Sequence, residues 1–79
     1  MKRDKLEIIR RMLLICKKGA KKTRVVYEAN LNFTTAGAYL DWLINRKMIA
    51  KESDSFITTP RGDELLSNLQ SASTFLDLK

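Results

Sequence analysis

The stretch NFTTAGAYLDWLINRKM, residues 32–48, decides the fold that we expect for this chain of 79 residues. Asn32 is a favoured residue for capping the start of a helix. Apolar side chains then recur at helical spacing and would form one buried face: Phe33, Ala36, Leu40, Leu43 and Ile44. The opposite side carries small or hydrogen-bonding residues: Thr34, Thr35, Ala38, Asp41 and Asn45. Such a helix can pack on its own domain while its outer face lies close to another surface.

Two further helices are expected before this stretch. Residues 4–18 are typical of a helix that ends at Gly19, a natural left-handed terminator. Its core stripe would be Leu6, Ile9, Leu13 and Cys16, and a second apolar stripe beside it would be Ile8, Met12 and Ile15. Residues 20–31 would form the second helix, with Val25, Val26 and Ala29 directed inward. Asn30 and Asn32 then predict a turn, because asparagine tolerates the left-handed conformations that usually need glycine.

A hairpin and a last helix are expected after it. The segments MIAKESD and SFITT contain β-branched or aromatic residues and meet near Asp54 and Ser55, which is typical of a hairpin. Thr59 and Pro60 fit the N-cap and first position of a helix that would extend to Leu78. Its apolar seam would be Leu65, Leu69, Ala72 and Leu76. This helix is either a contact for a partner or an ordinary helix folded onto its own domain.

This order of elements predicts an α+β, mostly α fold: a winged helix-turn-helix with three helices, a two-stranded wing hairpin and a C-terminal helix. Residues 1–79 would form a single DNA-binding domain, with residues 60–78 available for dimerisation. Gly37 in the third helix then marks close approach of either a neighbouring helix or a DNA backbone, and we favour the helix. Trp42 is expected to pack beneath the wing or the last helix rather than to stack on a partner.

Composition limits the possible functions. The single cysteine, Cys16, permits no internal disulfide and is expected to be a packed, inert thiol. Histidine, the commonest metal ligand and general base, is absent from the sequence. The charged N-terminus differs from a signal peptide, and no apolar run reaches the length of a membrane span. We therefore expect a cytoplasmic, nucleoid-associated protein that is not an enzyme and has no cofactor, metal or membrane partner.

The positive charge of the chain is concentrated near its start. The formal net charge is +6, and residues 1–28 hold ten Lys or Arg against three Asp or Glu. This segregation favours a polyanion such as nucleic acid as a partner. The alternative is a solvated helix face that only maintains solubility.

The order of elements and three motifs resemble the small archaeal winged-helix DNA-binding regulators. The motifs are GAKKTRVVYEANLN (residues 19–32), YLDWLINRKMI (residues 39–49) and TPRG (residues 59–62). The resemblance implies a winged helix that binds double-stranded DNA and forms dimers through terminal helices. By position, it implies phosphate contacts at Lys21, Lys22 and Arg24 and major-groove contacts at Thr34, Thr35 and Ala38. We add Asn32, at the start of the third helix, and Lys51, the cation nearest the wing tip, to the expected DNA-binding residues. Where many relatives have a glycine before the first wing strand, this chain has Lys47, and its wing tip carries Glu52 and Asp54 in place of cations.

The function expected from these residues is sequence-specific DNA binding by a dimeric transcriptional regulator. The dimer interface would combine the second stripe of the first helix with the last helix: Ile8, Met12, Ile15, Leu69, Ala72 and Leu76. The third helix offers few residues that read bases, because no Arg or Asn lies in its first exposed turns. Two alternatives therefore stay open: a protein-interaction or assembly module, and a non-specific, chromatin-type DNA binder.

Overall fold

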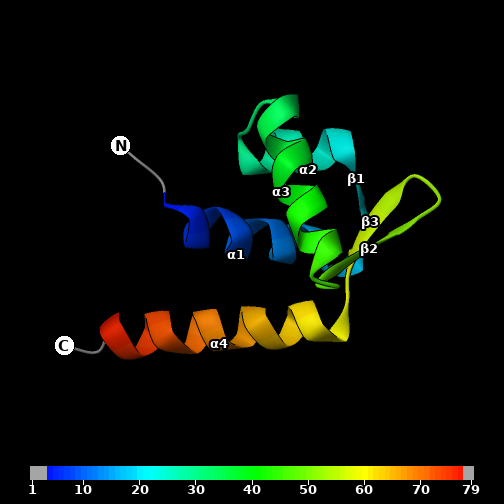
Figure 1. Ribbon diagram of the computed structural model, residues 1–79. Coiled ribbons are helices and arrows are strands. Elements are labelled where there is room, and N and C mark those ends of the chain that lie inside the picture. Colours follow the sequence, from blue (N-terminus) through cyan, green and yellow to red (C-terminus); the bar gives the residue numbers. More distant parts are fainter. Residues whose placement is uncertain (1–3, 78–79) are drawn as a thin grey trace.

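The computed structural model describes residues 4–77, and within residues 70–77 it describes only the helical backbone. Its elements are α1 (Lys5–Ile15), η1 (Cys16–Lys18), β1 (Ala20–Lys21), α2 (Lys22–Ala29), α3 (Phe33–Asn45), β2 (Ile49–Glu52), β3 (Ser55–Thr58) and α4 (Pro60–Asp77). Figure 1 shows α2 and α3 on one side of α1 and α4 along the other, while the β2–β3 hairpin projects away from both termini. The predicted winged helix-turn-helix is confirmed.

The wing has one strand more than the sequence predicts. β3 is the central strand of an antiparallel sheet with the order β1-β3-β2. Ala20 pairs with Phe56 and Lys21 with Ser55, so the first two residues of the predicted second helix belong to a strand instead. The helix α2 therefore begins at Lys22 and is shorter than expected. A strand of two residues has no periodicity from which it can be predicted.

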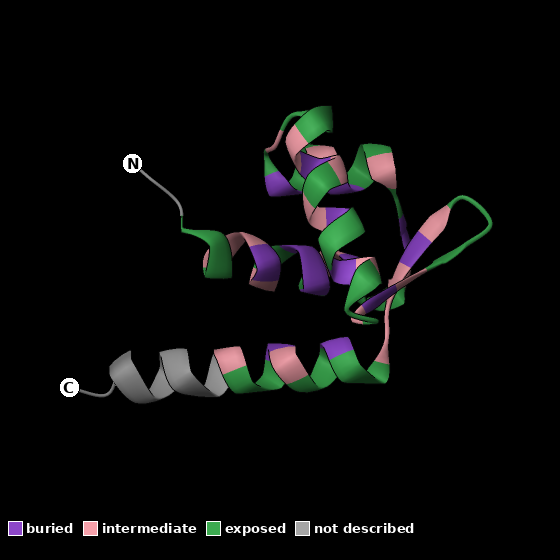
Figure 2. Ribbon diagram, in the orientation of Figure 1, coloured by how far each residue is buried: buried purple, intermediate pink, exposed green. Residues whose placement is uncertain are grey.

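The core lies where α1, α3 and the sheet meet (Figure 2). The face of α1 that enters it is rotated from the predicted one: Met12 is fully buried, whereas Leu6 is 60% exposed. Phe33, also predicted as core, is 54% exposed at the start of α3. On α4, Leu66 enters the core and Leu65 packs partly against it.

Two helices end at a residue that has the left-handed conformation although it is not glycine. Asn30 follows α2 with φ 57°, and the amide of Leu31 donates to the Val26 carbonyl over 3.0 Å. Lys47 follows α3 with φ 62°, and the amide of Met48 donates to the Leu43 carbonyl over 2.9 Å. Both ends have the Schellman pattern, in which the backbone turns sharply and satisfies the last carbonyls. Lys47 therefore has the backbone conformation that a glycine at this position would adopt without strain.

The TPRG motif joins the wing, α3 and α4. The Thr59 hydroxyl donates to the Lys47 carbonyl over 2.7 Å and accepts the Gly62 amide over 3.1 Å. The Thr59 amide donates to the Met48 carbonyl over 3.0 Å. A side chain on Gly62 would overlap that same Met48 carbonyl and lie 2.8 Å from Thr58 Cγ2. Only glycine allows this approach of α4 to the chain that connects α3 with the wing.

We predict that Gly62→Ala lowers the free energy of unfolding by about 1–3 kcal/mol, because backbone atoms must move to admit the methyl group. Gly37→Ala is the matched control. Its added carbon would meet the flexible end of Lys22 at 3.1 Å, and alanine is the better helix former by about 1 kcal/mol, so we expect little loss. Chemical denaturation of both variants measures the difference. If the two variants lost the same free energy of unfolding, the contact of Gly62 with the Met48 carbonyl would not require glycine.

The burial of Cys16 predicts how its thiol reacts. Its side chain is fully buried. Burial raises the pKa of the thiol from 9.0 to about 11, and the nearby Arg24 acts in the opposite direction. We expect the native thiol to resist iodoacetamide at mildly alkaline pH and to react once the protein is unfolded, as read by mass spectrometry.

The same shift predicts a pH dependence. The unfolded thiol ionises near 9.0, whereas the folded thiol keeps its proton up to about 11, so its contribution to stability is lost as pH rises between these values. At about 1.4 kcal/mol per pKa unit, the unfolding free energy of the wild type should fall by up to about 3 kcal/mol more than that of Cys16→Ala. Parallel pH profiles would contradict this.

Candidate nucleic-acid interface

The helix-turn-helix α2–α3 is held by local hydrogen bonds. The left-handed Asn30 ends α2 and the chain reverses through Leu31. The Asn32 side-chain oxygen then accepts the amide of Thr35 over 2.7 Å and caps α3. Asn32 is one of the predicted DNA contacts, and its side-chain oxygen is used to cap α3. Both asparagines thus set the angle at which α3 is presented.

The outer face of α3 is open. Thr34 and Ala38 are exposed and Thr35 is partly exposed, as the sequence predicts. Asp41 and Asn45 continue this face toward the end of the helix and are also exposed. Small side chains at the start of α3 permit close approach of another surface, whereas the carboxylate of Asp41 would repel phosphates that came near it.

Lys22 lies beside the N-terminal end of this face, which we call its foot. Its side chain crosses from α2 to α3, where the ammonium lies 5.8 Å from the centroid of the Phe33 ring and close above Gly37. A side chain of the neighbouring helix thus lies over Gly37, but its flexible end could move to admit a methyl group, so this contact does not require glycine. In the part of the chain that the structure describes, no ion pair involves Lys22. Its charge is therefore available beside the start of α3.

The other two predicted cations of this region are paired with carboxylates. Lys21 Nζ lies 3.5 Å from Asp54 Oδ2 at the tip of the wing, and Arg24 Nε lies 2.8 Å from Glu28 Oε2 one turn further along α2. All four side chains are at least 43% exposed. Exposed pairs of this kind contribute about 0–1 kcal/mol, so a phosphate can displace the carboxylate at small cost.

The wing contributes less positive charge than α2. Lys51 is exposed on β2, with its ammonium 5.7 Å from the centroid of the Phe56 ring. The ion pair between Asp54 and Lys21 of β1 explains why an acidic residue lies at the tip of the wing. Sequence reasoning missed this contact, since 33 positions separate the two residues and no local spacing connects them.

Trp42 does not occupy the predicted place beneath the wing or α4. It is 40% exposed on α3, and the Arg46 guanidinium stacks 4.1 Å from the centroid of its ring. Beside it, a groove of about 410 Å³ between α1 and α3 is lined by Lys5, Ile9, Ala38, Tyr39 and Trp42. The signal for the stacked pair was present in the sequence, because residues four apart on a helix are neighbours.

The residues predicted for a dimer interface fall into three groups. Met12 is buried in the core of its own domain and is removed from that interface, because no partner can reach it. Ile8 and Ile15 are partly buried against the core, and Leu69 is partly exposed on α4. Ala72 and Leu76 lie outside the residues whose side chains are described. Leu6 and Leu14 of α1 are exposed apolar residues that sequence reasoning did not assign to a surface.

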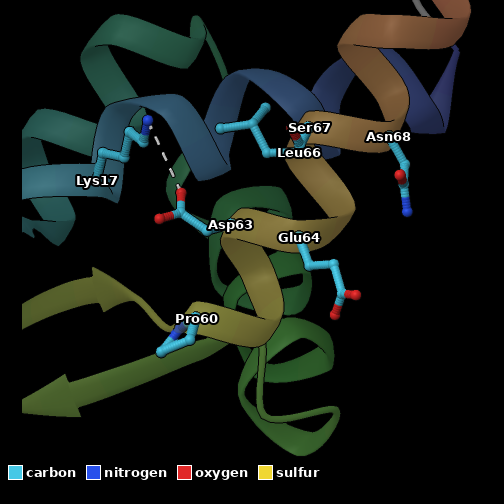
Figure 3. Close-up of a pocket in the computed structure, with 7 residues that line it drawn as sticks. All are labelled: Lys17, Pro60, Asp63, Glu64, Leu66, Ser67 and Asn68. Atoms are coloured by element: carbon cyan, nitrogen blue, oxygen red, sulfur yellow. Dashed lines mark ion pairs between the residues drawn. The ribbon is translucent and has the colours of Figure 1, made fainter.

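A second hollow lies at the start of α4 (Figure 3). It has a volume of about 490 Å³ and is lined by Lys17, Pro60, Asp63, Glu64, Leu66, Ser67 and Asn68. The ammonium of Lys17 faces Asp63 at 3.9 Å, while Glu64 points away from that pair. The lining has more negative than positive charge, which makes this hollow a poor site for a polyanion.

We also searched the described residues for metal-ligand clusters and for helices that could span a membrane. Among the residues that the structure describes, no cluster of three or more potential metal ligands occurs. None of the described helices combines the length and the apolar character that crossing a bilayer demands.

Comparisons with known proteins agree with this architecture. The chain is 39% identical over 69 residues to the uncharacterised protein MJ0287 of Methanocaldococcus jannaschii, covering 86% of this chain and 71% of that protein. It is 37% identical over 71 residues to MJ0290 of the same organism, covering 89% of this chain but only 34% of MJ0290. The chain thus spans about a third of that longer relative.

A solved structure is also similar. It is Sso10a-2, a DNA-binding protein from Sulfolobus solfataricus, with a TM-score of 0.82 and 28% sequence identity, covering 95% of this chain and 83% of that one. A family model described as winged helix-turn-helix matches residues 2–76. The chain therefore belongs to the winged helix-turn-helix family.

Proposed function

We propose that the protein binds double-stranded DNA with sequence preference through α2 and α3 and regulates transcription as a homodimer. The observation that carries this proposal is the open, small-residue face of α3, with Thr34 and Ala38 exposed and Lys22 at its foot. The major groove is wide enough to admit an α-helix, and small outer side chains let the backbone of such a helix lie close to the base edges. The similarity to Sso10a-2, which is a DNA-binding protein, supports the same assignment.

Each part of the surface has a separate role in this proposal. Lys21, Lys22 and Arg24 contact phosphates and set the register of the protein on the duplex. Thr34, Thr35 and Ala38 face base edges, where threonine donates or accepts hydrogen bonds and the alanine methyl contacts thymine. On the wing, Lys51 adds one phosphate contact. Lys21 exchanges the Asp54 carboxylate for a phosphate when DNA binds.

The proposed protein is a binding protein without catalytic activity. The only thiol of the chain is buried and keeps its proton at physiological pH. We place the protein in the cytoplasm, on the nucleoid, because its proposed partner is there. The proposal of an archaeal regulator rests on the organism of the similar proteins MJ0287 and MJ0290.

One rival function has a specific observation in its favour. Asp41 lies on the exposed face of α3, and no Arg, Lys or Asn lies between Phe33 and Leu40. A surface with few base-reading groups suits a non-specific, chromatin-type DNA binder. The two functions differ in specificity ratio, since the non-specific binder would hold random and selected duplexes with equal affinity. A protein-interaction module would bind neither.

Ala38→Glu tests the role of α3. We expect this change to weaken duplex binding by at least about tenfold, because the new carboxylate would face phosphates and base acceptors while staying solvated in the free protein. Ser67→Glu introduces the same charge at an exposed position of α4 and serves as the control. Fluorescence anisotropy of a labelled duplex measures both. Equal affinities for the two variants would move the DNA surface away from α3.

Lys22→Ala tests the phosphate contacts. Each phosphate that the variant no longer neutralises should reduce the slope of log affinity against log salt by about 0.9, and in a symmetric dimer by about twice that. Lys18→Ala removes an equal charge from η1, at an exposed position to which we assign no DNA contact, and should leave the slope unchanged. Affinity should fall on all sequences alike. If the slope stayed constant while discrimination between sequences disappeared, Lys22 would read bases.

Dimerisation is proposed through α4 and the edge of α1. Leu69, with Ala72 and Leu76 after it in the sequence, continues the apolar seam of α4, and Ile8 and Ile15 are partly buried on α1. Burying each such side chain contributes roughly 1.5–3 kcal/mol, so a few per subunit sustain a stable pair. Sedimentation equilibrium should give a dimer for the wild type and a monomer for Leu69→Asp, with Ser67→Asp as the control. A wild-type monomer at high micromolar concentration would refute the proposal.

A further inference from the structure

The groove beside Trp42 has the chemistry of a nucleobase site. Its floor is Ile9, which is 7% exposed, and two aromatic side chains, Tyr39 and Trp42, line it from α3. Lys5 of α1 adds a positive charge to the lining, and none of the described residues that line the groove is a carboxylate. Within the described chain, no ion pair involves Lys5. An apolar floor, aromatic sides and one cation match a planar ring that carries a phosphate.

The Trp42 ring is held in place by a second cation. The Arg46 guanidinium lies 4.1 Å from the ring centroid, at the spacing of one helical turn along α3. Stacking of this kind restricts the indole and places positive charge next to it. A strand that passes Trp42 would therefore meet Lys5 from α1 and Arg46 from the end of α3.

We propose that this groove binds an unpaired base of a single-stranded nucleic acid, with the base stacked beside Trp42 and a neighbouring phosphate on Lys5. The open shape of the groove and its continuity with the outer face of α3 at Ala38 suit a polymer that passes through it. This activity goes beyond the proposed duplex binding, since a paired base is stacked within the helix and cannot enter a groove between α1 and α3. Aromatic stacking tolerates every base, so little sequence preference is expected.

Trp42 is the only tryptophan of the chain and reports directly on the groove. A short oligothymidylate is the probe, because it forms little secondary structure of its own. Titration at low salt should quench Trp42 fluorescence, excited where tyrosine does not absorb, until the signal saturates. Binding of a labelled duplex, read by anisotropy, is measured in parallel, so failure of one activity is distinguishable from failure of the other.

Variants assign the binding to the groove. With a labelled oligothymidylate, Trp42→Ala should weaken binding roughly five- to hundredfold, and Trp42→Phe should recover part of this loss by stacking. Lys5→Gln should reduce the salt slope by about 0.7, the value for one phosphate of a single strand. Lys18→Gln carries the same charge change away from the groove and should change neither the affinity nor the slope. Thermal melting confirms that each variant folds.

Three results would overturn the proposal. The first is an unchanged Trp42 signal with oligothymidylate while the duplex binds. The second is equal single-strand affinity for Trp42→Ala and the wild type. The third is a response of Trp42 to benzoate, a small aromatic carboxylate, without any response to the oligonucleotide, which would make the groove a small-molecule site.

Discussion

The close contact between Gly62 and the Met48 carbonyl is the constraint on which the arrangement of this domain depends. At this point the end of α3, the start of the wing and the start of α4 meet within one network of backbone and Thr59 hydrogen bonds. A second threonine, Thr58, donates its hydroxyl to the Leu13 carbonyl over 2.7 Å and ties β3 to α1. Because α3, the wing and α4 share these hydrogen bonds, the end of α3 is held against the rest of the domain, while Leu40 and Leu43 hold the helix in the core.

The electrostatic consequence is a surface whose charge is partly neutralised in the free protein. Two of the three cations near the start of α2 are paired with Asp54 and Glu28, while Lys22 lies against α3. Exposed pairs are worth so little that phosphates can replace the carboxylates. Without DNA, these pairs limit the repulsion within a strongly basic segment. On a duplex, exchange of carboxylate for phosphate would release the full charge toward the partner.

Much of this fold could be predicted from the sequence, because its signals are local. Asn32 as a cap, Thr59 and Pro60 at the start of α4, and the hairpin all follow from short-range rules. Asn30 does too, since asparagine replaces glycine in the left-handed position. The same helical periodicity places the proposed DNA-facing residues of α3 on its exposed side.

The features that could not be predicted depend on contacts between distant segments. The strand β1 exists only because β3 pairs with it, and Lys21 meets Asp54 only through that pairing. The rotation of α1 that buries Met12 and exposes Leu6 depends on which helices cover each turn. Trp42 is 40% exposed and lines a groove between α3 and α1, a neighbour that the sequence did not indicate. Apolar periodicity identifies a helix face but not the neighbour that occupies it.

The central claim is that the outer face of α3, with the cations at its foot, is a surface for duplex DNA. The most direct test is a binding titration of the wild-type protein against random duplexes and duplexes selected for binding, repeated at several salt concentrations. Our account predicts tight binding that falls linearly in log affinity with log salt, and a clear preference for the selected sequences. Equal affinity for all duplexes would contradict the sequence preference. Absence of salt-dependent binding would contradict the claim itself.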